Sequence, residues 1–437
     1  MQYHDISHIY NCFLSVDQKI STDTRKEIKA TLFFCLSGAR FNGNFYAKKA
    51  LELGAAYVVT NSIDFIDERI LYVKEPNETL IQLAKHHSEQ VNTKFIAIGG
   101  SNGKTTTKEL VSAVLREKFK IQATPGNFNN HIGVPLTLLS VKPDCELAII
   151  ELGTNHPGEM AILCHMFKAD TALITNIGLE HLEGFNDIEA VAREESEVYL
   201  MAQRDNALAF VNQDDTWLNN MSKRLDLTKT YSTVNSGADI FVQVHNEMPL
   251  LSLEIFVNGK SMGVIDSRLG GRFNAQNIAA AISIGSYYSV PFPSIIKGIS
   301  EYIPNMNRSQ WIETIDGKHI FLDAYNANPS SMEAGIKSFA TLKGTKTYLL
   351  GDMLELGNHS KKEHQNIFAL IQSMGVEDAF FVGSEFKKAL PSFPFIFDNT
   401  ESLLAWLDTH PIDSEYIYIK GSRGIAMEQC LDHFKLS

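Results

Sequence analysis

A glycine-rich turn between an apolar run and a helix pattern constrains this chain more than any other stretch. Residues 95–98 are apolar, and the turn and helix start that follow are Gly99, Gly100, Ser101, Asn102, Gly103, Lys104, Thr105 and Thr106. Glycines let backbone N–H groups approach phosphate oxygens, and the helix N-terminus adds the positive end of its dipole. A lysine here neutralises β- and γ-phosphate charge, and the threonine hydroxyl after it holds Mg²⁺. The stretch therefore predicts a phosphate-binding loop after a buried strand.

The surroundings of the turn agree with this interpretation. Apolar residues at helical spacing predict a helix packed beneath the loop, and they are Leu110, Val111, Val114, Leu115 and Phe119. The loop is shorter than the general pattern, because Ile98 stands where the first glycine belongs and Gly100 comes only three residues before Gly103. A chance glycine turn is the alternative, and the strand and helix patterns on either side count against it.

Composition limits the classes of protein that the chain can represent. Its 437 residues suggest two to four domains at roughly 150 residues each, and we expect three. A net charge of −12 argues against a general nucleic-acid or anionic-membrane surface, which needs clustered cations. The 5 cysteines are odd in number and lack a C-x-x-C pair, so neither a disulfide framework nor a zinc site is indicated. With no apolar run near the roughly 18 residues that span a membrane, we expect a cytoplasmic protein without membrane insertion.

Residues 1–88 read as a small N-terminal α/β unit. Strands are expected at 31–36 and 55–59 and a helix near 47–53. Asp23 and Arg25 lie in a polar turn before the first strand, where arginine offers a forked donor for phosphate. A capped polar turn explains this segment equally well.

Residues 89–307 read as a parallel-sheet mononucleotide-binding unit, because strands alternate with helices after the phosphate loop. Residues 123–135 are rich in amide side chains, and Asn127 and Asn130 are candidates for substrate contacts, although such residues also favour turns. Glu151 ends a buried strand at the edge where open parallel sheets bind ligands, so it is a candidate Mg²⁺ ligand. His181 follows another strand to the same edge; a structural histidine is the alternative.

The stretch 208–270 is strand-rich, with a hairpin turn expected at Asn258 and Gly259.

Residues 308–437 read as a third α/β unit of the dinucleotide-binding kind without a phosphate loop. Its expected strands are residues 320–322, 348–350, 380–382 and 416–419. Polar loops follow three of them, at residues 323–329, 351–357 and 420–424. Polar loops at one sheet edge imply a ligand there.

With these segments in order, the sequence resembles the Mur ligases over nearly its whole length. The short phosphate loop is similar to theirs, and the loops 323–329 and 351–357 resemble the branch that adds D-alanyl-D-alanine. The resemblance implies a monomeric enzyme that uses ATP and two Mg²⁺ ions. It further implies two small-molecule substrates, UDP-MurNAc-tripeptide and D-alanyl-D-alanine, joined through an acyl phosphate.

The resemblance also implies roles for single residues at matching positions. Lys104 would hold the β- and γ-phosphates, Thr105 and Glu151 the first Mg²⁺, and His181 the second. Contacts to ATP are implied for Asn274, Arg308 and Asp323. The peptide cleft would be lined by Tyr325, Asn326, Asn328, Lys420 and Arg423. Asp23 and Arg25 would hold the uridine diphosphate, while Asn42 and Asn44 depart from the family pattern in the loop 37–45 and leave other nucleotide contacts open.

A second departure concerns the helix after His181. Mur ligases of this kind commonly carry there a lysine whose carbamate binds the second Mg²⁺, and this chain has Glu195. Helical periodicity places Glu195 within an apolar stripe and turns Glu194 and Glu197 away from it. We expect Glu195 to supply the metal-binding carboxylate directly and to belong to the catalytic residues with Lys104 and His181. A salt bridge at the helix surface is the alternative.

Two other functions remain open on sequence alone. A folylpolyglutamate synthase uses the same chemistry, but it has no unit comparable to residues 1–88. A non-catalytic nucleotide-binding relative would keep the fold without turnover. The presence of Lys104, Thr105, Glu151 and His181 argues against it.

Overall fold

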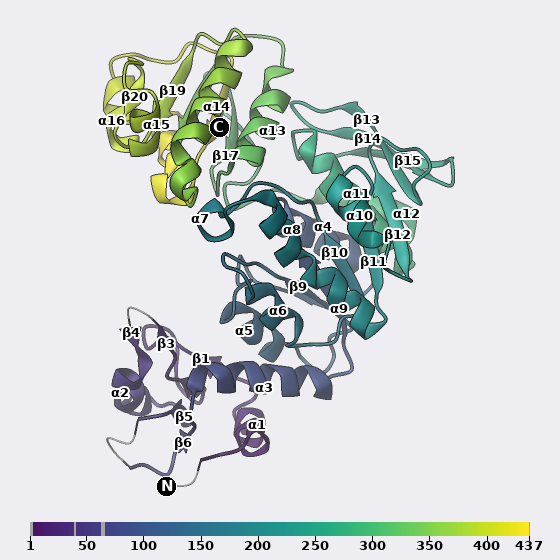
Figure 1. The fold of residues 1–437 in the computed structure, drawn as a ribbon, viewed down its shortest axis with the longest axis vertical. Coiled ribbons are helices and arrows are strands. Elements are labelled where there is room, and N and C mark those ends of the chain that lie inside the picture. The colour runs from purple at the N-terminus through teal and green to yellow at the C-terminus, as the bar shows by residue number, and fades with distance from the viewer. Residues whose placement is uncertain (1–2, 39–40, 63–65, 437) are drawn as a thin grey trace.

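The computed structural model describes residues 3–38, 41–62 and 66–436. Three α/β units follow one another along the longest axis of the molecule, with the N-terminal unit at one end and the C-terminal unit at the other (Figure 1). The expected α/β architecture is confirmed. The boundaries after residues 88 and 307 stay predictions, and the first falls inside a helix that ends at Gln90.

The N-terminal unit has a parallel sheet in the order β1-β2-β5-β6. Its strands are β1 (Ile20–Ser21), β2 (Leu32–Phe34), β5 (Tyr57–Thr60) and β6 (Ile70–Tyr72), beside a hairpin of β3 (Ser37–Gly38) and β4 (Phe41–Asn42). Its helices are α1 (Ile6–Ser15), α2 (Ala47–Glu52) and α3 (Pro76–Gln90), with a 3₁₀ turn at Gly43–Tyr46. The apolar runs predicted as strands form the buried middle of this sheet. Residues 39–40 of the loop 37–45 lie outside the described residues.

The central unit contains one large sheet, in the order β15-β14-β13-β12-β11-β10-β7-β9-β8. Its strands are β7 (Lys94–Gly99), β8 (Ile121–Ala123), β9 (Leu147–Glu151), β10 (Thr171–Ile174), β11 (Leu208–Asn212), β12 (Thr228–Ser232), β13 (Ile240–Asn246), β14 (Ser252–Val257) and β15 (Lys260–Asp266). All neighbouring strands pair in parallel except β13 with β14 and β14 with β15, which are antiparallel. The hairpin predicted at Asn258 and Gly259 is confirmed. Because β7 lies between β9 and β10, the order reverses there, and such switch points are where open parallel sheets bind ligands.

Helices cover both faces of this sheet. They are α4 (Lys104–Arg116), α5 (Gly133–Leu139), α6 (Glu159–Cys164), α7 (Leu182–Phe185), α8 (Ile188–Glu195), α9 (Glu197–Asp205), α10 (Thr216–Ser222), α11 (Phe273–Tyr287) and α12 (Phe292–Glu301). The apolar stripe predicted for α4 is buried, and it packs against α11 and α12. Phe119 lies beyond the end of α4 and is only partly buried against the same core. This packing holds the phosphate loop and the start of α11 side by side.

The C-terminal unit is built on a sheet in the order β16-β17-β21-β18-β19-β20. Its strands are β16 (Gln310–Glu313), β17 (His319–Asp323), β18 (Lys346–Gly351), β19 (Ala379–Val382), β20 (Ile396–Phe397) and β21 (Tyr416–Lys420). Its helices are α13 (Pro329–Ala340), α14 (Ser360–Ser373), α15 (Ser384–Ala389) and α16 (Thr400–Leu407), with 3₁₀ segments at Gly357–His359, Arg423–Ile425 and Met427–His433. All pairs are parallel except β16 with β17. The polar loops predicted after β17, β18 and β21 therefore leave one edge of the sheet.

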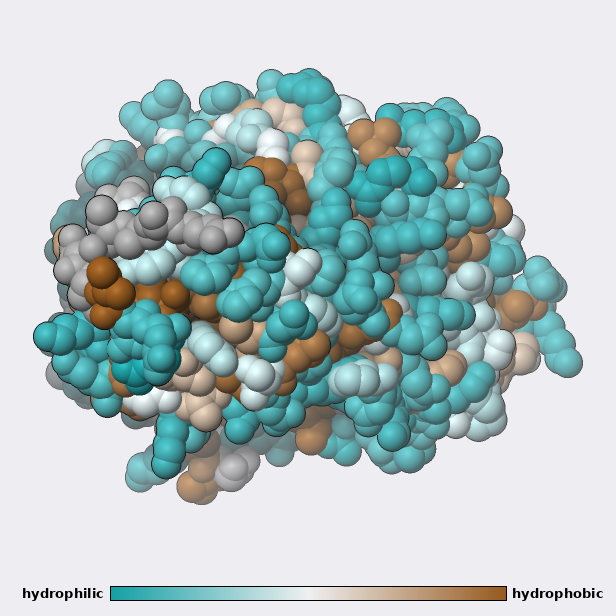
Figure 2. All heavy atoms as spheres, turned by 90° about the horizontal axis from the view of Figure 1, so that it is seen from below, coloured by the Kyte–Doolittle hydropathy of each residue, from teal (hydrophilic) through white to brown (hydrophobic). Residues whose placement is uncertain are grey.

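The surface is mostly hydrophilic where the molecule is viewed from the N-terminal end, and the apolar side chains there form separate groups (Figure 2). Within the described ranges, no helix is both long and apolar enough to cross a bilayer. The five cysteines are free and buried.

A buried histidine joins the N-terminal and central units. His87 on α3 is fully buried, and its Nε2 lies 2.9 Å from the carbonyl oxygen of Val141. Since a carbonyl only accepts, Nε2 carries the hydrogen, and Nδ1 accepts from the hydroxyl of Tyr10 at 3.1 Å. Burial lowers the pKa of His87. The neutral ring is therefore the form that this junction accommodates.

This junction should make folding stability sensitive to acid. Below the ordinary histidine value of 6.5, the unfolded chain binds a proton at His87 that the folded chain does not. The free energy of unfolding should therefore fall as pH drops from 6.5, by at most about 1.4 kcal/mol per pH unit for this group. His87→Gln should show a shallower slope in denaturant titrations between pH 5 and 7. Equal slopes for the variant and the wild type would contradict the assignment.

Candidate functional site

A cavity of about 510 Å³ lies between the central and C-terminal units. It brings together most of the residues singled out in the sequence, namely Ser101, Asn102, Gly103, Lys104, Thr105, Thr106, Asn127, Asn130, Glu151, His181, Asn274, Arg308, Asp323, Tyr325, Asn326, Asn328, Lys420 and Arg423. Gly100 belongs to the phosphate loop and Glu195 lies behind it, and neither residue lines the cavity. Asp23 and Arg25 belong to the N-terminal unit and are also outside it.

The phosphate loop needs its glycines for conformational reasons. Gly100 and Gly103 have φ angles of 115° and 78°, in the region that other residues rarely adopt. Gly103 is the N-cap of α4, and a side chain there would collide with Asn277 of α11. The first turn of α4 can therefore approach α11 closely, and residues 101–106 line the cavity.

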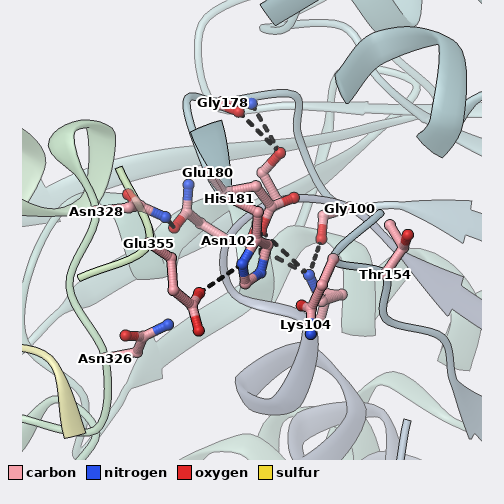
Figure 3. A network of polar contacts seen from close by, with 12 residues as sticks. Gly100, Asn102, Lys104, Thr154, Gly178, Glu180, His181, Asn326, Asn328 and Glu355 are labelled. Atoms are coloured by element: carbon pink, nitrogen blue, oxygen red, sulfur yellow. Dashed lines mark hydrogen bonds and ion pairs between the residues drawn. The ribbon is translucent and has the colours of Figure 1, made fainter. Parts of the chain in front are cut away.

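Lys104 folds back over this loop and lies among carboxylates. Its Nζ donates to the carbonyl oxygens of Gly100 and of Ser101, and it lies 3.6 Å from Glu180 Oε2 (Figure 3). Burial lowers the pKa of Lys104, but Glu180, Glu195 and Glu151 outweigh burial and raise it. Lys104 is therefore a cation held at the mouth of the phosphate loop.

Glu151 is the centre of a second group of contacts. It ends β9 and is 1% exposed. Its Oε1 accepts from Thr105 Oγ1 at 3.0 Å and from Asn129 Nδ2 at 2.9 Å. Its Oε2 has no hydrogen-bond partner among the described residues. A buried carboxylate oxygen without a donor, beside a threonine hydroxyl, has the oxygen chemistry that suits Mg²⁺.

A Mg²⁺ ion at Thr105 and Glu151 would also need oxygen ligands from a bound phosphate group and from water. No group of three or more His, Cys, Asp or Glu side chains placed to hold a metal occurs in the part of the chain that the structure describes. Mg²⁺ is usually held by one or two protein carboxylates together with phosphate oxygens and water. Thr105 and Glu151 fit such a site.

His181 is oriented by the C-terminal unit. It has a φ of 46°, and its Nδ1 lies 2.6 Å from Glu355 Oε2 in the loop after β18 (Figure 3). Its Nε2 lies 3.8 Å from Glu180 Oε2. The hydrogen bond from His181 lowers the pKa of Glu355, whereas burial raises the pKa of Glu180. Sequence reasoning missed both glutamates, although Glu180 directly precedes His181 and Glu355 lies in a polar strand-end loop.

Asparagines join the two units beside the phosphate loop. Asn328 Nδ2 donates to Asn102 Oδ1 at 2.8 Å (Figure 3), and the backbone N–H of Leu179 donates to Ser330 Oγ at 3.1 Å. Asn274 is buried at the start of α11, and its Nδ2 donates to Ser309 Oγ at 3.0 Å. These bonds join the start of the C-terminal unit to the central unit beside the cavity.

Cations and an aromatic ring form the wall on the C-terminal side. The guanidinium of Arg308 lies 3.6 Å from the ring centroid of Tyr325, and that of Arg423 lies 5.3 Å from it. Lys420 is nearly fully buried, and its Nζ lies 2.6 Å from Asp323 Oδ2. The wall can therefore bind anionic groups.

The helix after His181 differs from the sequence prediction in one respect. Glu195 is fully buried as expected, and its Oε2 accepts from the Gly100 N–H at 2.6 Å, while its Oε1 has no hydrogen-bond partner in the described ranges. Burial raises the pKa of Glu195 to about 8. Glu194, which was predicted to turn away from the apolar stripe, is nevertheless buried. Glu194 is buried because residues 153–160 cover its side of α8, and it accepts from Gly158 N at 2.8 Å and Met160 N at 2.7 Å.

The predicted nucleotide contacts of the N-terminal unit lie apart from the cavity. Arg25 makes a bidentate pair with Asp23, with 2.8 Å between Nη2 and Oδ2, and its side chain is 88% exposed. Asn42 and Asn44 bind each other, and Asn44 Oδ1 also accepts from Thr60 Oγ1 at 2.6 Å. The structure gives these asparagines local roles.

Comparison with known proteins identifies the family of this chain. The Mur ligase middle domain matches residues 98–285, and the Mur ligase, glutamate ligase domain matches residues 307–394. The chain is also 32% identical over 432 residues to a ligase of Bacillus subtilis strain 168, covering 94% of this chain and 91% of that protein. The chain therefore belongs to the Mur ligase family.

Two relatives in that family have the same name. The protein of B. subtilis is UDP-N-acetylmuramoyl-tripeptide--D-alanyl-D-alanine ligase, as is one of Escherichia coli K12, 31% identical over 94% of this chain and 92% of that protein. MurF from Acinetobacter baumannii superposes with a TM-score of 0.85 at 27% identity, covering 95% of this chain and 92% of that one. The MurF ligase of Thermotoga maritima, solved in complex with ADP, shares the fold with a TM-score of 0.85 at 23% identity, covering 96% and 97%.

The contacts of Glu194 predict that it fixes one loop of the cavity. Glu194→Gln keeps the shape of the side chain but leaves only one oxygen for the N–H groups of Gly158 and Met160. One of these two donors then faces the NH₂ group of the amide, which cannot accept a hydrogen bond from it. Amide exchange at Gly158 and Met160 should become about tenfold faster or more, as for the loss of a hydrogen bond to a charged group. Glu189→Gln, on the exposed side of α8, is the control. Unchanged exchange in Glu194→Gln would contradict this role.

Proposed function

We propose that this chain is an ATP-dependent ligase that joins D-alanyl-D-alanine to UDP-MurNAc-tripeptide in the cytoplasm. The observation that carries the proposal is the cavity in which the phosphate loop faces the polar strand-end loops of the C-terminal unit. The central unit supplies the phosphate loop with Lys104, and the C-terminal unit supplies the wall with Arg308, Lys420 and Arg423. Relatives with this named activity match 94% of the chain and therefore most of residues 1–88, a unit that a folylpolyglutamate synthase would lack.

The chemistry follows from the low reactivity of a carboxylate. The tripeptide carboxylate attacks the γ-phosphorus of ATP, ADP leaves, and an acyl phosphate forms. The amine of D-alanyl-D-alanine then attacks the acyl carbon through a tetrahedral intermediate, loses a proton, and inorganic phosphate leaves with the C–O electron pair. Lys104 places a fixed positive charge where the β- and γ-phosphate oxygens converge, which stabilises the charge that develops during transfer.

Two Mg²⁺ ions would bind beside these groups. Thr105 and Glu151 would hold the first, and His181 and Glu195 the second. When bound, Mg²⁺ screens the repulsion between the phosphate oxygens and the incoming carboxylate. Glu151 and Glu195 each have one buried oxygen without a hydrogen-bond partner among the described residues, which supports these assignments.

The other residues divide between nucleotide and peptide. We assign ATP contacts to the loop residues Gly100, Ser101, Asn102, Gly103 and Thr106, and to Asn274, Arg308 and Asp323. The peptide substrates would contact Asn127, Asn130, Tyr325, Asn326, Asn328, Lys420 and Arg423. Asp23 and Arg25 would hold the uridine diphosphate, and the exposed guanidinium of Arg25 is accessible for it.

Phosphate release tests the proposal. With ATP, Mg²⁺ and UDP-MurNAc-tripeptide, release should require D-alanyl-D-alanine and should not respond to L-Ala, D-Glu or L-Lys. Lys104→Met should reduce turnover by about 100-fold or more, as for loss of one preorganised group that stabilises developing charge. Lys120→Met removes an exposed lysine that pairs with Asp144 and is the control. A folded wild type that releases no phosphate with any acceptor would instead indicate a non-catalytic relative.

The assignment of Glu195 makes a separate prediction about metal use. Because a glutamate needs no carbamate, wild-type activity should be the same in CO₂-depleted and bicarbonate-containing buffer. Glu195→Gln should raise the Mg²⁺ concentration for half-maximal activity by about tenfold or more, since even groups that only support a metal ligand have effects of this size. Glu189→Gln serves again as the control. Full activity of Glu195→Gln at limiting Mg²⁺ without CO₂ would exclude Glu195 as a ligand.

A further inference from the structure

A fully buried lysine lies one helical turn below Lys104. Lys108 has no exposed surface, and lysine is rarely buried in this way unless its charge is paired. Residues four apart share a face of a helix, so Lys108 continues the face of α4 that carries Lys104. Its Nζ donates to the carbonyl oxygens of Thr124 at 2.7 Å and Gly126 at 2.8 Å. Lys108 therefore holds the turn at the start of the amide-rich loop, residues 124–130, by hydrogen bonds to its backbone.

The same loop is also attached to Glu151. Thr124 Oγ1 accepts from the Glu151 N–H at 2.9 Å, and Asn129 Nδ2 donates to Glu151 Oε1 at 2.9 Å. Lys108 Nζ lies 3.6 Å from Glu151 Oε2, and its nearest carboxylate oxygen is Oε1 of the neighbouring Glu109 at 3.1 Å. Lys108, the loop and Glu151 thus form a closed ring of contacts beside Thr105.

This ring lies against the cavity. Asn127, Asn129, Asn130 and Glu151 all line it. Another lysine offers a comparison, because Lys118 Nζ also donates to two loop carbonyls, those of Tyr288 at 3.0 Å and Ser289 at 2.9 Å. Lys118 contributes nothing to the cavity lining.

We propose that Lys108 is a positioning residue that holds the loop 124–130 in register with the phosphate loop and thereby sets the affinity for the peptide substrate. It acts through Thr124, Gly126 and Glu151 and does not touch substrate. The ammonium group of Lys108 holds the carbonyls of Thr124 and Gly126 in place, and the turn they belong to orients Asn127 and Asn130. Glu151 connects this loop to Thr105, because it accepts hydrogen bonds from both Asn129 and Thr105. The substrate named here rests on the proposed function.

The first test needs no substrate. Amide exchange in residues 124–133 should be about tenfold faster in Lys108→Met than in the wild type, as expected when charge-assisted hydrogen bonds are lost. Lys118→Met, which removes the same type of contact elsewhere, should leave these amides unchanged. Equal exchange in Lys108→Met and the wild type would overturn the proposal. If Lys108→Met does not fold, Asn129→Ala opens the ring from the other side, and unchanged exchange in residues 124–133 of that variant would overturn it.

The second test separates positioning from general damage. In Lys108→Met, KM for UDP-MurNAc-tripeptide should rise about tenfold while KM for ATP changes less than about threefold. Lys108→Met and Asn129→Ala should combine less than additively, because each opens the same ring. Equal changes in both KM values, or strict additivity, would overturn the proposal. If the wild type does not catalyse ligation, the proposed function is refuted instead. Amide exchange in residues 124–133 would then decide whether Lys108 holds the loop.

Discussion

The charge on Lys104 has to be balanced inside the protein, and the architecture of the central unit provides that balance. Glu151, Glu180 and Glu195 are buried around it, and each has one oxygen without a hydrogen-bond partner in the described ranges. Buried charges are tolerated when they are paired, and removing one partner leaves the others uncompensated. The cation and its carboxylates therefore depend on one another.

The three carboxylates come from different elements, which explains why the whole central unit is required. Glu151 ends β9, Glu180 lies in the loop after β10, and Glu195 ends α8. They meet because β7 lies between β9 and β10 and α8 packs beside the phosphate loop. The sheet order thus determines the electrostatics of the site.

Sequence patterns predicted the parts of the site that depend on local structure. The phosphate loop, Glu151 and His181 follow from strand ends and helix starts, which a single segment specifies. The contacts of His181 with Glu355 and of Asn102 with Asn328 join residues more than about 170 positions apart, and no local pattern encodes such docking. The burial of Glu194 was not predicted, because periodicity identifies one buried face, whereas α8 is covered on a second side. The edge strands β16 and β20 were not predicted, because they are short, only partly buried and without a clear apolar pattern.

The bonds that join the central and C-terminal units are made by groups that face the cavity itself. His181 bonds Glu355, and Asn102 bonds Asn328, with all four side chains in its lining. A molecule that takes over either partner has to replace a bond between the units, so part of its binding free energy is offset. By thermodynamic reciprocity, the free energy of the contact between the central and C-terminal units then determines part of that molecule's affinity. Occupancy of the cavity and the arrangement of the two units are in this way a single equilibrium.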